Sequence, residues 1–182
     1  YLYVGLTRGS AKKTIWKDIF QVIILKLNVP AKLVGLEIRF DNGSIIHIGG
    51  ADSDYKQMEK LRGQKYRIAV VDECQSFTQD LKELVESIIV PTLTDIKGTL
   101  CMIGTPGNEQ GLHYWWQIND PKNQTGVWKD FQWTWKDNPF VRDNIKTYLE
   151  ELITQDPNIV NTTSYRQEWL GEWVIEDNAR VY

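Results

Sequence analysis

Strand-like and helix-like patterns alternate from the start of the chain. Residues 2–7 are apolar and β-prone, which predicts a short strand. Apolar residues then recur with helical spacing until Pro30, which ends the predicted helix. Residues 36–40 and 44–48 are two further strand-like runs, and the Asn-Gly pair between them predicts a β-hairpin. A short helix is expected over residues 55–61.

The middle of the chain repeats this alternation. Residues 67–72 form an almost continuous apolar run, which is typical of a strand covered on both faces in a parallel sheet. Residues 81–89 carry apolar side chains on one helical face, and Ser76 with Gln79 predicts a capping box before them. Residues 99–103 predict a second buried strand. This order of strands and helices predicts an α/β sheet.

The second half of the chain has a different composition and holds seven of the eight tryptophans. Residues 128–135 are β-like. Asn138 and Pro139 predict the N-cap and first residue of a helix that ends at Asp156. Residues 164–171 predict a last short helix. We expect the tryptophans to pack a core and lid, because aromatic side chains bury a large area; base stacking is the alternative.

Composition narrows the class of protein. The chain has 182 residues, of which 42% are hydrophobic and 25% are charged, so we expect one globular domain or one domain with a short appendage. No apolar run is long enough to span a membrane. Two cysteines and two histidines in no metal-ligand spacing argue against a zinc site or a disulfide framework. Without an initiator Met, the chain begins in a predicted strand, and we expect a fragment of a longer protein.

The residues that indicate chemistry are Asp72 and Glu73. Four apolar residues followed by Asp-Glu, at the end of a predicted central strand, form a Walker B pattern. In this position one acid can hold Mg²⁺ beside nucleotide phosphates, and the other can deprotonate the attacking water. The alternative is a strand that simply ends in acidic residues on a polar loop.

Two further positions fit an ATPase. Gly104-Thr105-Pro106 ends the next predicted strand, where the Thr105 hydroxyl is placed to sense the γ-phosphate; an ordinary turn is the alternative. Arg62 precedes Asp72 by ten residues and is a candidate arginine finger, or else a surface arginine in a turn.

A complete phosphate loop is absent from the sequence. Residues 7–14 lie between a strand and a helix and end in Lys-Thr, but Thr7 and Lys12 stand where glycines are needed for close approach to phosphate. We expect the true loop upstream. The same segment is basic, and its cations form either a solvated face or a contact with an anion such as DNA phosphate: Arg8, Lys12, Lys13 and Lys17. The net charge of -3 excludes a broad positive field.

Taken in order, these motifs resemble the ATPase domain of a tailed-phage terminase large subunit, the DNA-packaging motor. The likeness covers nearly all of residues 1–182. The segments that carry it are Thr7–Lys12 with Trp16, Leu61-Arg62-Gly63, Ile68–Glu73, Ile103–Pro106, Asp137-Asn138-Pro139 and Arg166–Trp173.

The resemblance implies a RecA-like (ASCE-type) P-loop ATPase sheet with flanking helices, lacking its N-terminal phosphate-loop portion and followed by a Trp-rich lid or linker. Residues 1–136 are then the core of the ATPase domain, and residues 137–182 are a helical closing region leading to a nuclease domain beyond the chain. By resemblance, Asp72 binds Mg²⁺ and the ATP phosphates and Glu73 is the catalytic base. Thr105 contacts the nucleotide and couples hydrolysis to movement, and Arg62 is a finger acting in cis or in trans.

The function implied is ATP-driven translocation of viral double-stranded DNA into procapsids, in the cytoplasm of the infected bacterial host. The implied partners are double-stranded DNA, the portal protein, the terminase small subunit and further copies in a ring, with no membrane. Two alternatives stay open: a helicase-type ATPase fragment, and a non-catalytic structural or interaction module, since residues 1–182 lack a phosphate loop.

Overall fold

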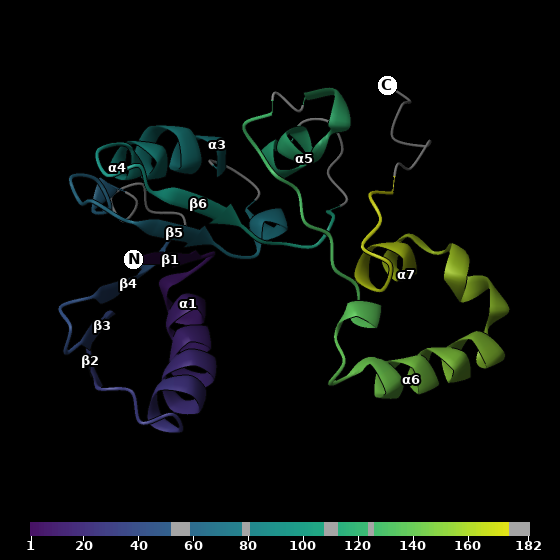
Figure 1. Ribbon diagram of the computed structural model, residues 1–182. Helices are drawn as coiled ribbons and strands as arrows, with labels where there is room; N and C mark the ends of the chain where they lie inside the picture. Colours follow the sequence, from purple (N-terminus) through teal and green to yellow (C-terminus); the bar gives the residue numbers. More distant parts are fainter. Residues whose placement is uncertain (52–58, 78–80, 108–112, 124–125, 175–182) are drawn as a thin grey trace. The chain divides into compact units, whose positions relative to one another are not determined.

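The computed structural model describes residues 1–51, 59–77, 81–107, 113–123 and 126–174 (Figure 1). The chain divides into two compact units, Tyr1–Gly104 and Thr105–Tyr182. The boundary expected at residue 136 falls inside the second unit. The functional assignment of residues 137–182 as a closing region stays a prediction.

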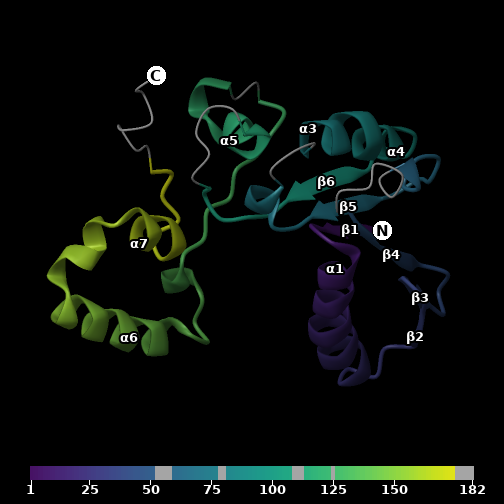
Figure 2. The same cartoon turned by 180° about the vertical axis from the view of Figure 1, so that it is seen from behind.

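The first unit is built on one six-stranded sheet with the order β2-β3-β4-β1-β5-β6 (Figure 2). β1 is parallel to β4 and β5, and β5 is parallel to β6, which confirms the predicted parallel sheet. The predicted hairpin is the antiparallel pair β3–β4, and β2 adds an antiparallel strand that the sequence analysis missed. The strands are β1 (Leu2–Gly5), β2 (Ala31–Val34), β3 (Glu37–Phe40), β4 (Ile45–Gly50), β5 (Ile68–Val71) and β6 (Thr99–Met102).

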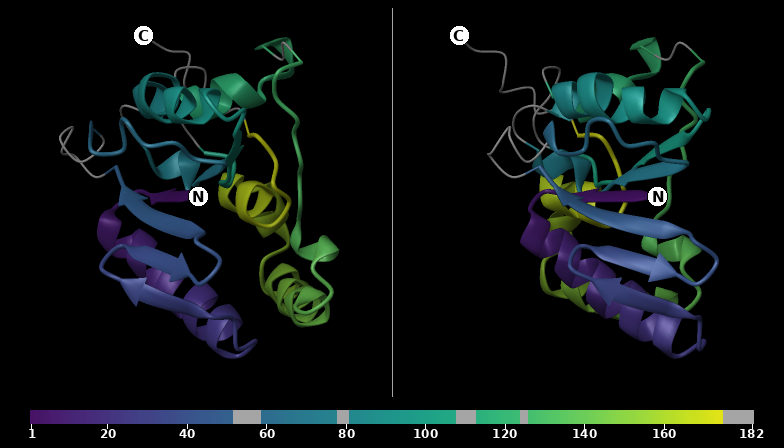
Figure 3. Two further views of the ribbon diagram at one scale, coloured as in Figure 1. Left: turned by 60° about the vertical axis from the view of Figure 1, so that its left-hand side comes forward. Right: turned by 90° about the vertical axis from the view of Figure 1, so that its left-hand side faces the viewer.

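One face of this sheet is covered by the first helix, α1 (Arg8–Thr14), which continues as the π-helical segment η1 (Ile15–Leu25) (Figure 3). Thr7 begins the helix through a capping box with Ser10, which satisfies backbone N–H groups that the first turn leaves open.

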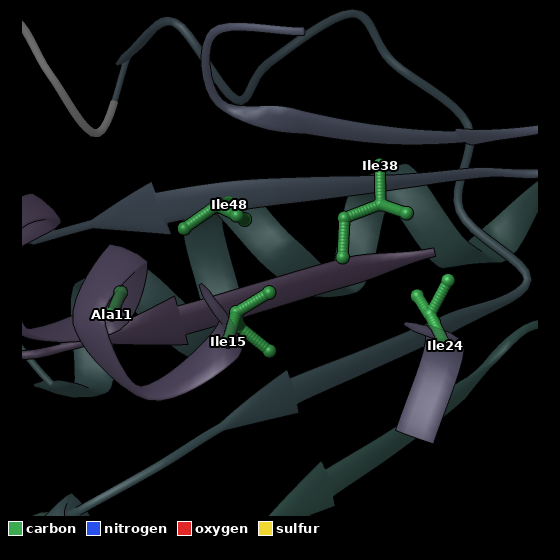
Figure 4. Packing of buried hydrophobic residues seen from close by; sticks show 5 residues of the cluster. All are labelled: Ala11, Ile15, Ile24, Ile38 and Ile48. Atoms are coloured by element: carbon green, nitrogen blue, oxygen red, sulfur yellow. The ribbon is translucent and has the colours of Figure 1, made fainter. Parts of the chain in front are cut away.

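Helical spacing places Ile15, Ile19, Val22 and Ile23 on one apolar face, and Ile15 and Ile19 do pack on the sheet. Val22 and Ile23 are instead 45% and 44% exposed, because the π-helical turn shifts the register and buries Ile24 in their place. The contacts of the helix form a cluster of buried side chains: Ala11, Ile15, Ile24, Ile38 and Ile48 (Figure 4).

The other face is covered by a second continuous helix, made of α3 (Leu81–Glu83), η3 (Leu84–Ile89) and α4 (Val90–Thr94) (Figure 3). It buries the predicted apolar face: Leu81, Leu84, Val85, Ile88 and Ile89. Residues 99–103 were expected to form a buried strand, and β6 confirms the strand over Thr99–Met102. The expected burial is wrong, because Thr99 and Cys101 are exposed. Among the described residues β6 pairs on one side only, so part of its surface stays open.

The second unit is helical in its described part. Its elements are α5 (Tyr114–Asn119), η4 (Pro121–Asn123), η5 (Trp135–Asp137), α6 (Arg142–Gln155), η6 (Pro157–Asn161) and α7 (Thr163–Glu168). The β-like interpretation of residues 128–135 is wrong: the described residues of this stretch form no strand. Aromatic residues favour strands only where a neighbouring strand accepts their backbone hydrogen bonds, and the described part of this unit offers none.

The long helix also begins later than expected, at Arg142 instead of Pro139. The Asn138 side chain accepts a hydrogen bond from the N–H of Phe140 at 3.1 Å, so it closes a tight turn before the helix. The helix ends at Asp156 as predicted, and α7 begins after the N-cap Thr162, two residues earlier than expected.

Several tryptophans pack together within the second unit. The Trp173 ring lies 6.2 Å from that of Trp115 and 5.1 Å from that of Trp116, measured between ring centroids. Trp169 packs on Tyr148 at 5.9 Å. The expectation of core packing is confirmed for Trp115, which is 8% exposed, whereas Trp133 is 75% exposed. Trp116, Trp169 and Trp173 are half-buried.

Two expected features lie wholly or largely outside the described residues. They are the helix expected over residues 55–61, most of which is not described, and Gln79 of the expected capping box. Within the described part of the chain, no helix is long and apolar enough to cross a membrane.

Gly50 ends β4 where α1 begins, and this contact yields a matched test. A Cβ atom added to Gly50 would lie 2.1 Å from the backbone nitrogen of Arg8, whereas one added to Gly9 meets nothing closer than 3.7 Å. We expect Gly50→Ala to lower the free energy of unfolding by about 1–3 kcal/mol through overpacking. We expect Gly9→Ala, inside a helix, to raise it by about 0.5–1 kcal/mol. Urea denaturation measures both, and equal effects of the two changes would contradict the packing described.

Candidate functional site

The candidate site is the turn that follows β5. The backbone N–H of Asp72 donates to the carbonyl of Val4 at 2.9 Å, and the N–H of Cys74 donates to the carbonyl of Ile103 at 2.9 Å. The turn is therefore anchored to the ends of β1 and β6, the two strands that flank β5. Since the three strands are parallel, their carboxyl ends meet at one edge of the sheet, which is where α/β sheets bind ligands.

The Asp72 carboxylate is held through both of its oxygens. Oδ1 accepts the backbone N–H of Glu73 at 3.0 Å. Oδ2 accepts the phenolic hydroxyl of Tyr3, a residue of β1. The carboxylate is thus oriented by its own turn and by the neighbouring strand, while Asp72 as a whole stays half-buried.

Glu73 has an unusual backbone conformation for a non-glycine residue. Its φ of 58° and ψ of 44° lie in the left-handed region, which costs energy and is enriched at functional sites. Its exposed carboxylate accepts the side-chain amide of Gln75 at 2.5 Å. The turn therefore presents the second acid outward and holds its head in place.

Gly104, directly after the strand-end residue Ile103, approaches this turn closely. A Cβ atom there would lie 2.4 Å from Oε1 of Gln75 and 3.0 Å from the backbone nitrogen of Cys74. Only glycine fits without a shift of the turn. The end of the β6 segment, Ile103-Gly104, is therefore in contact with the turn that carries Asp72 and Glu73.

The residues after Gly104 are anchored within the second unit. The indole N–H of Trp115 donates to the carbonyl of Thr105 at 3.0 Å. The side-chain amide of Gln167, which is 5% exposed, donates to the carbonyl of Gly107 at 3.1 Å. Thr105 is thus the first residue of a segment that α5 and α7 hold by its backbone, and its predicted contact with nucleotide stays a prediction.

Arg62 is held against the second helix. Its Nε pairs with the carboxylate of Glu59 at 2.8 Å, and a guanidinium nitrogen donates to the carbonyl of Ser87 at 2.8 Å. These contacts fit a surface arginine in a turn. They also fit an arginine finger that gives up both contacts when subunits assemble. Its role as an arginine finger stays a prediction.

The basic residues near the start of α1 are open to solvent. Lys12, Lys13 and Lys17 are exposed, and Arg8 is half-buried. Thr7, where a phosphate loop has glycine, uses its side chain to cap the helix. The exposure of these lysines is compatible with both alternatives, a solvated basic face and a contact with an anion such as DNA phosphate.

The donors at the site suit Mg²⁺ shared with a nucleotide. No group of three metal-ligating side chains occurs among the described residues, so a protein cage for a metal is not formed there. One carboxylate at a strand end suffices for Mg²⁺ when phosphate oxygens and water supply its other ligands, which leaves the adjacent carboxylate free for another task.

Two residues of this site, Gln75 and Tyr3, were not predicted. Gln75 lies two positions from Glu73, so a search for partners of that acid would have included it. Tyr3 reaches Asp72 across 69 residues of sequence, and no local pattern marks it.

Comparison with known proteins decides the family. The sequence model described as phage terminase large subunit matches residues 8–172. The chain belongs to the phage terminase large subunit family. No curated protein sequence matches this terminase chain.

Solved structures agree with the family. The large terminase of a thermophilic bacteriophage, in complex with ADP, matches with a TM-score of 0.69 at 14% identity, over 96% of this chain and 40% of that one. The ATPase domain of the Thermus phage P74-26 large terminase matches with a TM-score of 0.55 at 14% identity, over 95% and 76%. The HK97 bacteriophage large terminase matches with a TM-score of 0.56 at 14% identity, over 94% and 39%.

These likenesses establish the fold of the terminase chain. It has the RecA-like α/β architecture of terminase ATPase domains, as predicted from the motifs. The chain spans about 40% of the length of the complete large terminases that it matches.

The two cysteines test whether the turn after β5 is closed. Cys74 is 0% exposed, and burial raises the pKa of its thiol to about 12, whereas Cys101 is exposed on β6. We expect the thiol left in Cys101→Ser to react with a disulfide reagent at least ~100-fold more slowly than the thiol left in Cys74→Ser, because the thiolate is the reactive form. In denaturant the two variants should react alike. Fast labelling of native Cys101→Ser would show that the turn is open.

Proposed function

We propose that this chain is the hydrolytic part of a phage DNA-packaging ATPase. The observation that carries the proposal is the geometry of Asp72 and Glu73, at the end of the strand between β1 and β6. Membership of the terminase large subunit family and the ADP bound to one structural neighbour support a nucleotide as the ligand.

The two acids have separate tasks in the proposed reaction. Mg²⁺-ATP supplies the phosphoryl group and the metal charge that neutralises it. Asp72, held at both oxygens, is the carboxylate oriented to bind the Mg²⁺. Glu73, exposed and outward on its left-handed backbone, accepts a proton from the attacking water.

Movement is proposed to pass along the backbone through Gly104. Gly104 contacts Gln75, which holds Glu73, and the next residues are held by Trp115 and Gln167. A change around Glu73 would thus pull on a segment tied to helices α5 and α7. This gives Thr105 its proposed coupling role.

Family membership supports a proposal for the biological setting. We propose double-stranded DNA, the portal protein and the small subunit as partners of a homo-oligomeric ring that fills procapsids in the host cytoplasm. The family match disfavours the alternative of a helicase-type ATPase. The alternative of a non-catalytic module is tested by measuring whether the intact protein hydrolyses ATP.

The first test is Glu73→Gln in the intact protein. Removal of the general base should leave ATP binding intact and lower the hydrolysis rate by ~10²–10⁴-fold. Glu86→Gln, at an exposed position on η3, is the matched control and should hydrolyse ATP like the unmodified protein. Near-normal turnover by Glu73→Gln would remove Glu73 from the mechanism, and no hydrolysis by the unmodified protein would favour the non-catalytic module.

The second test concerns Arg62. If it acts in trans, subunits carrying Arg62→Ala mixed with subunits carrying Glu73→Gln should regain activity at interfaces that combine an intact arginine with an intact base. Loss of the exposed pair with Glu59 and of the hydrogen bond to the Ser87 carbonyl should together cost about 1–2 kcal/mol of stability, so Arg62→Ala is expected to fold. No recovery at any mixing ratio would assign Arg62 to action in cis or to no role.

A further inference from the structure

Tyr3 lies beside the candidate site without belonging to any motif in the sequence. It is on β1, and its backbone pairs in register with Val70 of β5. Side chains alternate along a strand, so Tyr3, Val70 and Asp72 are directed to the same face of the sheet. This is the face covered by α1, and the Tyr3 ring packs against the buried cluster there.

The Tyr3 hydroxyl connects β1 to the acid at the end of β5. It donates a hydrogen bond to Oδ2 of Asp72. A tyrosine phenol carries its proton at neutral pH, so this hydroxyl is available as a donor to the carboxylate.

We propose that Tyr3 is a positioning residue, whose hydroxyl fixes the Asp72 carboxylate in the orientation that binds the Mg²⁺ of the nucleotide. The proposal rests on the proposed function. With Oδ1 held by the turn and Oδ2 held by Tyr3, the carboxylate cannot rotate about its terminal bond without losing a hydrogen bond. The lone pairs that remain for a metal ion are therefore fixed in direction.

The expected size of the effect follows from metal sites in general. Groups that hydrogen-bond to a ligating carboxylate typically change metal affinity or activity by about 10–100-fold when removed. Tyr3→Phe deletes only the hydroxyl and keeps the packed ring. The change should therefore act on the metal and not on the fold.

A matched control is available at the other end of the neighbouring strand β5. Tyr66 precedes β5, is 3% exposed, and its backbone N–H donates to the carbonyl of Thr92 at 3.0 Å. Tyr66→Phe also deletes one phenolic hydroxyl in the first unit. It lies at the amino end of β5, away from the turn that carries Asp72.

The experiment measures equilibrium ATP binding in the intact protein carrying Glu73→Gln, so that no turnover occurs. A fluorescent ATP analogue is titrated in EDTA and over a range of Mg²⁺ concentrations. We expect Tyr3→Phe to raise the half-saturating Mg²⁺ concentration by about 10–100-fold, to leave the affinity in EDTA unchanged, and to differ from Tyr66→Phe. Adding Tyr3→Phe to Asp72→Asn should have no further effect, because the two residues act as one unit.

Each other outcome is decisive. An unchanged or lower Mg²⁺ requirement in Tyr3→Phe overturns the proposal, since a hydroxyl that competes with the metal would tighten binding when removed. Equal weakening in EDTA and in Mg²⁺ shows a merely structural role and overturns it as well. If the reference protein shows no Mg²⁺-dependent ATP binding, the proposed function fails first, and the two failures are thereby distinguished.

Discussion

The parallel pairing of β5 with both β1 and β6 is the constraint on which the first unit depends. The hydrogen-bond ladder continues past the end of β5, because Val4 and Ile103 accept the N–H groups of Asp72 and Cys74. The chain must therefore turn at a fixed place on the sheet edge. Two helices pack one on each face and keep these strands rigid (Figure 3). The position of the two acids follows from this backbone pairing, and their side-chain contacts refine it.

The turn itself combines a strained residue with a close approach. The left-handed backbone of Glu73 carries a cost of about 1–3 kcal/mol, which persists only where surrounding contacts determine it. Here the surrounding contacts come from the buried side chain of Cys74 and from the backbone of Gly104, which approaches closely because it has no side chain. The conformation of this turn is therefore determined by its packing against Gly104.

Patterns with a local physical cause were predicted well. The apolar face of residues 81–89 and the hairpin around Asn42-Gly43 depend on spacing and turn chemistry, and the structure contains both. The failures share another cause. Residues 128–135 carry strand-forming aromatics without a described strand to pair with, and the Asn138 side chain caps a turn in place of the helix. In both cases tertiary surroundings override the local preference.

The sequence by itself determined the α/β order, the parallel sheet and the Asp72-Glu73 pair at a strand end, because periodicity and short motifs encode them locally. Only the tertiary structure decided which groups hold that pair. Gln75 turns back to hold Glu73, and Tyr3 reaches Asp72 across 69 residues. Hydrogen bonds of this kind depend on where strands and helices meet in space. A one-dimensional pattern does not contain that information.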